Sequence, residues 1–135
     1  MSMSLAQKLA ADSIAAVAEG RNLQDVLAQI RAAHPELTAQ ENGALQDIAY
    51  GCQRYLGSLK HMLAQMLKKP IDNPQLESLL LAAMYQLHYT RNAPHAVVNE
   101  AVESIAKIGR GQFRSREVNR ELIQVAWLDS AVSYD

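Results

Sequence analysis

The stretch from residue 75 to residue 89 constrains the fold more than any other part of this sequence. One side of a helix here would carry Leu76, Leu79, Leu80, Ala83, Met84 and Leu87, and its other sides include Leu81, Tyr85 and His88. A helix that is apolar nearly all round is buried at the centre of a protein, because it has no side to turn toward water. We therefore predict a central helix over about 75–89, with Asn73 as its cap and Pro74 at its first turn.

The rest of the chain also predicts helices and almost nothing else. Residues of high helix propensity dominate it, and no segment shows the sustained apolar–polar alternation of a β-strand. The first further helix is predicted over about 4–19, with Gly20 as its stop, and the second lies between the Asn22 cap and His34-Pro35. The third follows a capping box at Thr38 and Glu41, and the fourth lies between Gly57-Ser58 and Pro70. Two more helices are predicted over 95–108 and over 115–128. Short connections of this kind are typical of an all-α, compact bundle, here of about seven helices. At this length we expect a single domain spanning residues 1–135.

Composition and charge exclude several classes of protein. The 135 residues are 49% hydrophobic and 20% charged, which excludes a disordered tail and a fibre. The longest apolar run, residues 79–85, is too short to cross a bilayer, and the N-terminus lacks the pattern of a signal peptide. The single cysteine, Cys52, excludes an internal disulfide framework. We therefore expect a cytoplasmic protein with no membrane partner.

The sequence lacks the motifs of most enzymes and cofactor-binding proteins. It contains neither of the common glycine-rich phosphate-binding motifs, and its 4 histidines include no pair spaced four residues apart on one helix. Cys52 lies on the predicted apolar stripe of the third helix, where a buried structural thiol is commoner than a nucleophile. We expect no catalytic residue, no metal and no cofactor in this chain.

One short segment is strongly basic, although the net charge of the whole chain is −1. It contains Lys107, Arg110, Arg114, Arg116 and Arg120, with only Glu117 opposing them. Phosphate neutralisation needs several cations on one surface, arginine adds bidentate geometry, and Phe113 could stack on an unpaired base. The segment is therefore a candidate RNA-binding site, and the alternative is an ordinary solvated turn between helices.

Four further residues are expected to have structural roles. Arg54 is the one cation in the apolar C-terminal half of the third predicted helix, so we expect it to pair with a carboxylate, with Glu100 as the first candidate. Pro94 would fix the entry to the sixth helix. Asn99 and Glu100 would lie in the first turns of that helix, where a carboxylate favours the helix dipole.

Several segments resemble the NusB-like family. The most specific block is Met-Tyr-Gln-Leu-His-Tyr at 84–89, followed by Pro-His-Ala-Val-Val-Asn-Glu-Ala-Val-Glu at 94–103. This block is most similar to the N-terminal domain of the bacterial 16S rRNA cytosine-C5 methyltransferases of the RsmB or Sun branch. Residues 15–27 and 45–59 resemble the same domain more weakly, so that the resemblance spans roughly residues 5–114.

The resemblance implies an all-α fold of two packed three-helix groups and a role connected with RNA. In the stand-alone antitermination proteins of the family the domain binds RNA and a ribosomal protein. In the methyltransferases it is an accessory to a catalytic domain that binds S-adenosylmethionine. The glycine-rich motif and catalytic cysteines of that domain are absent here, and Cys52 matches none of them. We therefore expect a non-catalytic domain that engages 16S rRNA or an RNA–protein complex and does not methylate RNA by itself.

Two departures from the family pattern keep other interpretations open. The last predicted helix keeps Val118 and Asn119, but Arg120 and Glu121 stand where a small and an apolar residue are expected, so residues 115–135 are divergent. The first helix offers only Lys8 where the antitermination proteins have several arginines. The chain could therefore be a helical protein-interaction module of the antitermination type, homodimeric and with little RNA affinity. A third interpretation is a component that acts only when a methyltransferase domain is supplied in trans.

Overall fold

The structure is a computed structural model that describes residues 4–66, 71 and 73–109, except for the side chains of residue 4 and residues 105–109. Its six helices are α1 (Ser4–Ala18), α2 (Leu23–Ala33), α3 (Ala39–Arg54), α4 (Leu56–Met66), α5 (Pro74–Tyr89) and α6 (Pro94–Gly109). The described ranges contain no strand, which confirms the all-α prediction. The predicted seventh helix, over 115–128, lies outside the described residues.

The predicted helix caps are present. Asn22 and Asn73 each accept a hydrogen bond from the backbone N–H three residues further on, at 3.2 Å and 3.0 Å. At the start of α3 the Thr38 hydroxyl accepts from the N–H of Glu41 at 3.1 Å, and the Glu41 carboxylate accepts from the N–H of Thr38 at 2.9 Å. Side-chain acceptors of this kind satisfy N–H groups that have no partner inside the helix. They fix where α2, α3 and α5 begin.

The end of α1 depends on a glycine in the left-handed conformation. Gly20 has a φ of 101°, its N–H bonds to the carbonyl of Val17 at 2.9 Å, and the N–H of Arg21 bonds to the carbonyl of Ala16 at 3.2 Å. These two bonds form the Schellman motif, which favours glycine because a Cβ would be strained at this φ. The predicted stop at Gly20 is therefore confirmed.

The predicted break between the third and fourth helices is wrong by about three residues. α3 ends at Arg54, Tyr55 is its C-cap with φ −109° and ψ 20°, and α4 begins at Leu56. Gly57 and Ser58 therefore lie in the first turn of α4 and do not separate the helices. The chain bends at Tyr55 because the ring of that residue packs on α5, and this tertiary contact outweighs the local preference of Gly57-Ser58 for a break.

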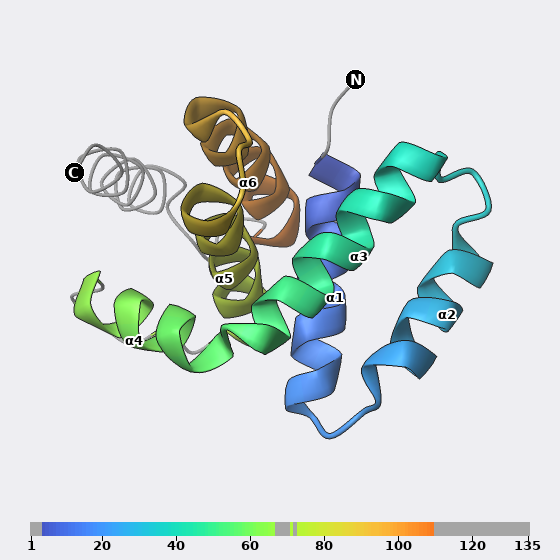
Figure 1. The fold of residues 1–135 in the computed structure, drawn as a ribbon, viewed down its shortest axis with the longest axis horizontal. Coiled ribbons are helices and arrows are strands. Elements are labelled where there is room, and N and C mark those ends of the chain that lie inside the picture. Colours follow the sequence, from blue (N-terminus) through green and yellow to red (C-terminus); the bar gives the residue numbers. More distant parts are fainter. Residues whose placement is uncertain (1–3, 67–70, 72, 110–135) are drawn as a thin grey trace.

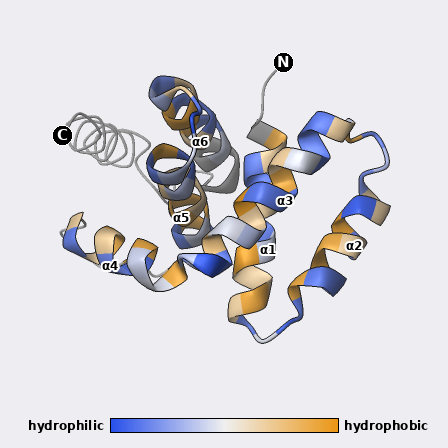
Figure 2. Cartoon of the chain, in the orientation of Figure 1, coloured by the Kyte–Doolittle hydropathy of each residue, from blue (hydrophilic) through white to orange (hydrophobic). Residues whose placement is uncertain are grey.

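α5 is the central helix, as its apolar sequence predicts. Every residue from Ser78 to Leu87 is buried, and the helix packs against α1, α3, α4 and α6. In Figure 2 the outer helices show hydrophobic and hydrophilic residues in alternation, as amphipathic helices do when only one side faces a core. The core therefore lies around α5, with side chains from α1 and α3 as its main additional contributors.

The helices form two groups, which agrees with the NusB-like architecture. Figure 1 shows α1, α2 and α3 on one side of the molecule and α4, α5 and α6 on the other. Contacts of α5 with α1 and α3, and of α6 with α1, join the two groups. The C-terminal end of α3 meets the end of α5, where Tyr55 stacks on Tyr89. Residues from the stretch 43–48 of α3 line a pocket together with the turn between α5 and α6.

Candidate functional site

The basic segment predicted as an RNA-binding site falls almost wholly outside the part of the chain that the structure describes. Lys107 belongs to α6, but its side chain is not described. The other members, Arg110, Phe113, Arg114, Arg116 and Arg120, follow the last described residue. Their arrangement on one surface stays a prediction.

Lys8, the remaining member of the predicted RNA-binding set, is engaged in an ion pair. Its Nζ lies 3.3 Å from Oδ2 of Asp12, one turn further along α1, and the two side chains are 36% and 37% exposed. Exposed pairs at this spacing contribute only about 0.3–0.5 kcal/mol to stability. The pair has a larger effect on the local surface charge than on stability, because the Asp12 carboxylate neutralises the one cation in the described part of α1. A role of Lys8 in RNA binding stays a prediction.

The structure overturns the predicted partner of Arg54. Its side chain is exposed at the end of α3, and the guanidinium carbon lies 5.6 Å from the centre of the Tyr55 ring, a cation–π distance. Within the described residues no carboxylate forms an ion pair with Arg54, so the expected pair with Glu100 is not present. An arginine in the last turn of a helix is favourable at the surface, because it faces the negative end of the helix dipole. Arg54 therefore does not need a buried carboxylate.

The other three residues with expected structural roles lie in the first turns of α6. Pro94 is the first residue of that helix, as predicted, because its fixed φ suits the first turn. Asn99 is exposed, whereas Glu100 is half-buried and lines a pocket together with residues of α3.

Three tyrosines form a stack where α3 ends beside α5, and sequence analysis did not find it. The rings of Tyr55 and Tyr89 lie 4.0 Å apart at an angle of 9°, and those of Tyr85 and Tyr89 lie 5.8 Å apart at 23°. Tyr89 is 37% exposed, and the His88 ring meets it edge-on at 5.0 Å. The spacing of Tyr85 and Tyr89, one helical turn apart, was the available signal.

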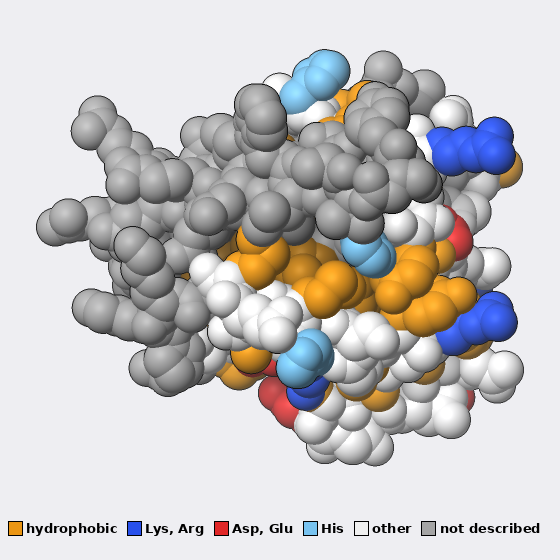
Figure 3. All heavy atoms as spheres, turned by 60° about the vertical axis from the view of Figure 1, so that its left-hand side comes forward, with side chains coloured by type: hydrophobic (Ala, Val, Ile, Leu, Met, Phe, Trp, Pro, Cys, Tyr) orange, Lys and Arg blue, Asp and Glu red, His pale blue; other side chains and the backbone are white. Residues whose placement is uncertain are grey.

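Hydrophobic side chains also reach the surface. Figure 3 shows a band of them on one face of the molecule, with histidine side chains beside it. Tyr50 and Tyr89 are the large hydrophobic residues with the greatest exposure among the described side chains. Exposed tyrosine rings close to a cation such as Arg54 offer surfaces on which an unpaired base can stack.

Tyr85 connects the stack to α3. Its ring lies against the backbone of Gly51, where a Cβ would collide with it, and its hydroxyl donates a 2.8 Å hydrogen bond to Oδ1 of Asp47. Burial and the bond to the carboxylate raise the pKa of the Tyr85 hydroxyl to about 12. The hydroxyl therefore stays protonated and holds Asp47 in place at neutral pH.

Asp47 lies at the edge of a pocket of about 440 Å³ between α3, α5 and the start of α6. The polar residues that line it are Asp47, Gln86, Asn92 and Glu100, and the rest of the lining is small or apolar. The volume lies in the range of about 300–1,000 Å³ that is typical of small-ligand sites. The pocket therefore combines carboxylate acceptors with side-chain amides.

A buried hydrogen-bond network sets the orientation of Gln86. Gln7 of α1 is fully buried, and its Nε2 donates to Oε1 of Gln86 at 2.8 Å and to the carbonyl of Val97 at 3.4 Å. The Val97 carbonyl can only accept, so Gln7 presents its nitrogen to this corner and Gln86 presents its oxygen to Gln7, while Oε1 of Gln7 is buried without a hydrogen-bond partner in the described residues. The amide nitrogen of Gln86 is thereby directed away from Gln7.

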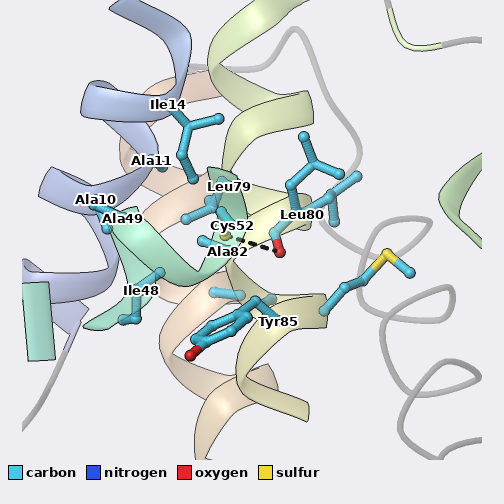
Figure 4. Close-up of a cluster of buried hydrophobic side chains, with 14 of the residues drawn as sticks. Ala10, Ala11, Ile14, Ile48, Ala49, Cys52, Leu79, Leu80, Ala82 and Tyr85 are labelled. Atoms are coloured by element: carbon cyan, nitrogen blue, oxygen red, sulfur yellow. Dashed lines mark hydrogen bonds between the residues drawn. The ribbon is translucent and has the colours of Figure 1, made fainter. Parts of the chain in front are cut away.

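Cys52 lies in the apolar core, as expected. Its side chain is fully buried in the core cluster shown in Figure 4, and its thiol donates to the carbonyl of Leu81 at 3.6 Å. Burial, with a smaller contribution from the charge of Asp47, raises the pKa of the thiol to about 12. A nucleophile needs the thiolate, which this buried environment disfavours.

The described residues contain no group of three or more His, Cys, Asp or Glu side chains that could hold a metal ion. None of the helices in these ranges is long and apolar enough to cross a membrane.

Comparison with known proteins finds one family and a consistent set of relatives. A model of the NusB family matches residues 4–125. The ribosomal RNA small subunit methyltransferase B of Sodalis glossinidius is 34% identical over 109 residues, which cover 78% of this chain and 24% of the relative. The protein of that name from Pectobacterium carotovorum is 34% identical over 107 residues, covering 76% and 25%. That from Yersinia pseudotuberculosis is 29% identical over 138 residues, covering 96% and 31%. The chain thus spans about a quarter of the length of the first two of these relatives.

Proposed function

The chain belongs to the NusB family, and from this premise we propose that it is a non-catalytic domain that engages 16S ribosomal RNA, alone or in an RNA–protein complex. The match to methyltransferase B covers about a quarter of each relative, which is the NusB-like part in the N-terminal region and not the catalytic domain. These relatives are named as methyltransferases of small-subunit ribosomal RNA. A cytoplasmic location belongs to the same proposal.

The single observation that carries this proposal is the extent of the family match. It covers residues 4–125 and therefore includes the whole basic segment from Lys107 to Arg120. Acidic residues outnumber lysine and arginine among the described side chains, so most phosphate contacts would have to come from that segment. The exposed tyrosines near Arg54 would then add stacking contacts, which do not depend on net charge.

The experiment is the binding of a 16S rRNA fragment to the chain, titrated at low and at moderate salt. We expect the double variant Arg110→Glu with Arg114→Glu to weaken binding equally for different RNA sequences, because phosphate contacts carry no sequence information. The slope of log affinity against log salt should fall by about two. Arg21→Glu with Arg31→Glu is the matched control. It changes the net charge by the same amount as the first double variant, but in α2 and in the turn before it. Unchanged binding by the first variant would make the segment an ordinary solvated turn.

A second function is favoured by the charge of the chain. The net charge of −1 is low for an RNA-binding protein and suits a helical module that binds a protein partner, a second copy of this chain included. If the chain does not bind the rRNA fragment at low salt, this function becomes the better one. A molecular mass that rises with protein concentration would then identify a homodimer.

A further inference from the structure

The pocket between α3, α5 and α6 has a hydrogen-bonding pattern that the protein itself leaves incomplete. Gln86 is only 2% exposed and lines this pocket. Its Oε1 accepts a hydrogen bond from Gln7, while no hydrogen bond donated by its Nε2 is found in the described part of the chain. This nitrogen is not one of the fully buried polar atoms without a partner, so it is accessible from the pocket that Gln86 lines. The Gln86 nitrogen is therefore a donor available to a ligand in the pocket.

Asp47 supplies an acceptor at the edge of the same pocket. Its Oδ1 accepts from the Tyr85 hydroxyl, which holds the side chain in one orientation. A carboxylate has about four acceptor positions, so Asp47 keeps free capacity on both oxygens. A ligand that suits the pocket must therefore offer a donor to Asp47 and an acceptor to Gln86 on one edge.

The surroundings of the pocket suit single-stranded RNA. Tyr85 bonds to Asp47 and its ring lies 5.8 Å from that of the exposed Tyr89, so the buried Tyr85 links the pocket to an exposed aromatic ring. Arg91 directly precedes the lining residue Asn92, and Arg54 lies over Tyr55 in the same stack. Proteins read single-stranded RNA by stacking unpaired bases on aromatic rings and by hydrogen bonds to their Watson–Crick edges. In this proposal Arg91 and Arg54 would contact the phosphates while the carboxylate contacts a base.

We propose that this pocket binds an unpaired guanine of single-stranded RNA. Guanine offers its ring N–H and exocyclic amine to the Asp47 carboxylate, and its carbonyl oxygen accepts from the amide nitrogen of Gln86. Adenine and cytosine present a ring acceptor where guanine has the N–H, and uracil lacks the second donor. This inference rests on the proposed function, because it assumes that the chain engages RNA. The pocket would be a second contact beside the basic segment, and it would recognise one base of that RNA.

The test compares two hexaribonucleotides, one of adenosines only and one with a single central guanosine. We expect the guanosine-containing RNA to bind about tenfold more tightly, the discrimination typical of one bidentate contact to a base. Asp47→Asn should remove most of that preference. Asp25→Asn is the matched control, because it removes the same charge from an exposed position on α2 and should keep the preference. If Asp47 acts only by repelling phosphates, both variants will strengthen binding of both RNAs, and the proposal is wrong.

A second measurement on the unaltered protein does not depend on how the variants fold. The side-chain amide resonances of Gln86 should shift on addition of the guanosine-containing hexamer and shift much less with the adenosine hexamer. Equal shifts, or shifts caused only by a short arginine peptide, would overturn the proposal, and the second result would assign the pocket to a basic protein partner. Binding of 16S rRNA through the basic segment without a guanosine preference would contradict the pocket proposal alone. Absence of any RNA binding would contradict both proposals.

Discussion

Tyr85 occupies the space that a side chain at position 51 would need. A Cβ built on Gly51 would overlap the Tyr85 ring, so α3 and α5 can cross this closely only with glycine there. The close approach lets the Tyr85 hydroxyl reach Asp47 on α3 and places the ring beside Tyr89. One glycine therefore positions both the tyrosine stack and an edge of the pocket.

We expect Gly51→Ala to lower the free energy of unfolding by about 1–3 kcal/mol, because the added methyl group forces Tyr85 or the α3–α5 crossing to move. Gly43→Ala is the matched control in the same helix, where a Cβ meets nothing within 4 Å. It should stabilise the protein by about 0.5–1 kcal/mol through helix propensity alone. Urea unfolding of the two variants gives the comparison. A stabilising Gly51→Ala would show that Tyr85 moves aside without cost.

Contacts such as that between Gly51 and Tyr85 could not be predicted from the sequence. The periodicity of apolar residues placed Tyr85 on the predicted central helix and Gly51 on the third predicted helix. Their contact, however, depends on how α3 and α5 cross. The same limit explains the error at Arg54. Its position in an apolar stretch suggested a buried ion pair, whereas the stretch ends at Tyr55 and leaves the guanidinium at the surface.

The ends of the helices were predictable because their signals are local. Asn22, Thr38 and Asn73 each cap a helix through a hydrogen bond to the residue three positions further on. The spacing of residue types in the sequence is therefore enough to predict these bonds. Gly57-Ser58 has an equally clear local signal, and the prediction there failed. The stacking of Tyr55 on Tyr89, two residues far apart in the sequence, determines that boundary instead.

We expect Thr38→Ala to lower the free energy of unfolding by about 1 kcal/mol, because α3 loses a side-chain acceptor at its first turn. Thr38→Ser keeps the hydroxyl and should cost much less. Thermal unfolding followed by circular dichroism measures both variants. If the alanine and serine variants melt at the same temperature, the capping bond contributes nothing to stability. The core contacts of α3 would then be sufficient to fix its start.

At the scale of the whole molecule, sequence analysis predicted the centre of the fold and the family but neither the tyrosine stack nor the pocket. The apolar composition of α5 identifies it as the central helix without any knowledge of its neighbours. The pocket needs residues from α3, α5, α6 and the turn between the last two, and only the packed structure brings them together. Gln7 and Gln86 illustrate the same point, since neither residue type indicates a buried bond between the first and fifth helices.

The hydrogen bond between Gln7 and Gln86 should couple the stabilities of the two helix groups. Replacing one glutamine by leucine leaves the polar atom of the other buried without its partner, whereas replacing both leaves an apolar contact. Gln7→Leu and Gln86→Leu together should therefore cost less than the sum of the single variants, by about 1–3 kcal/mol. Gln7→Leu combined with Thr38→Ala is the control pair, which should be additive because the two residues share no partner. Urea unfolding of the three single and two double variants would test this, and additivity in both pairs would show that the buried bond does not couple α1 to α5.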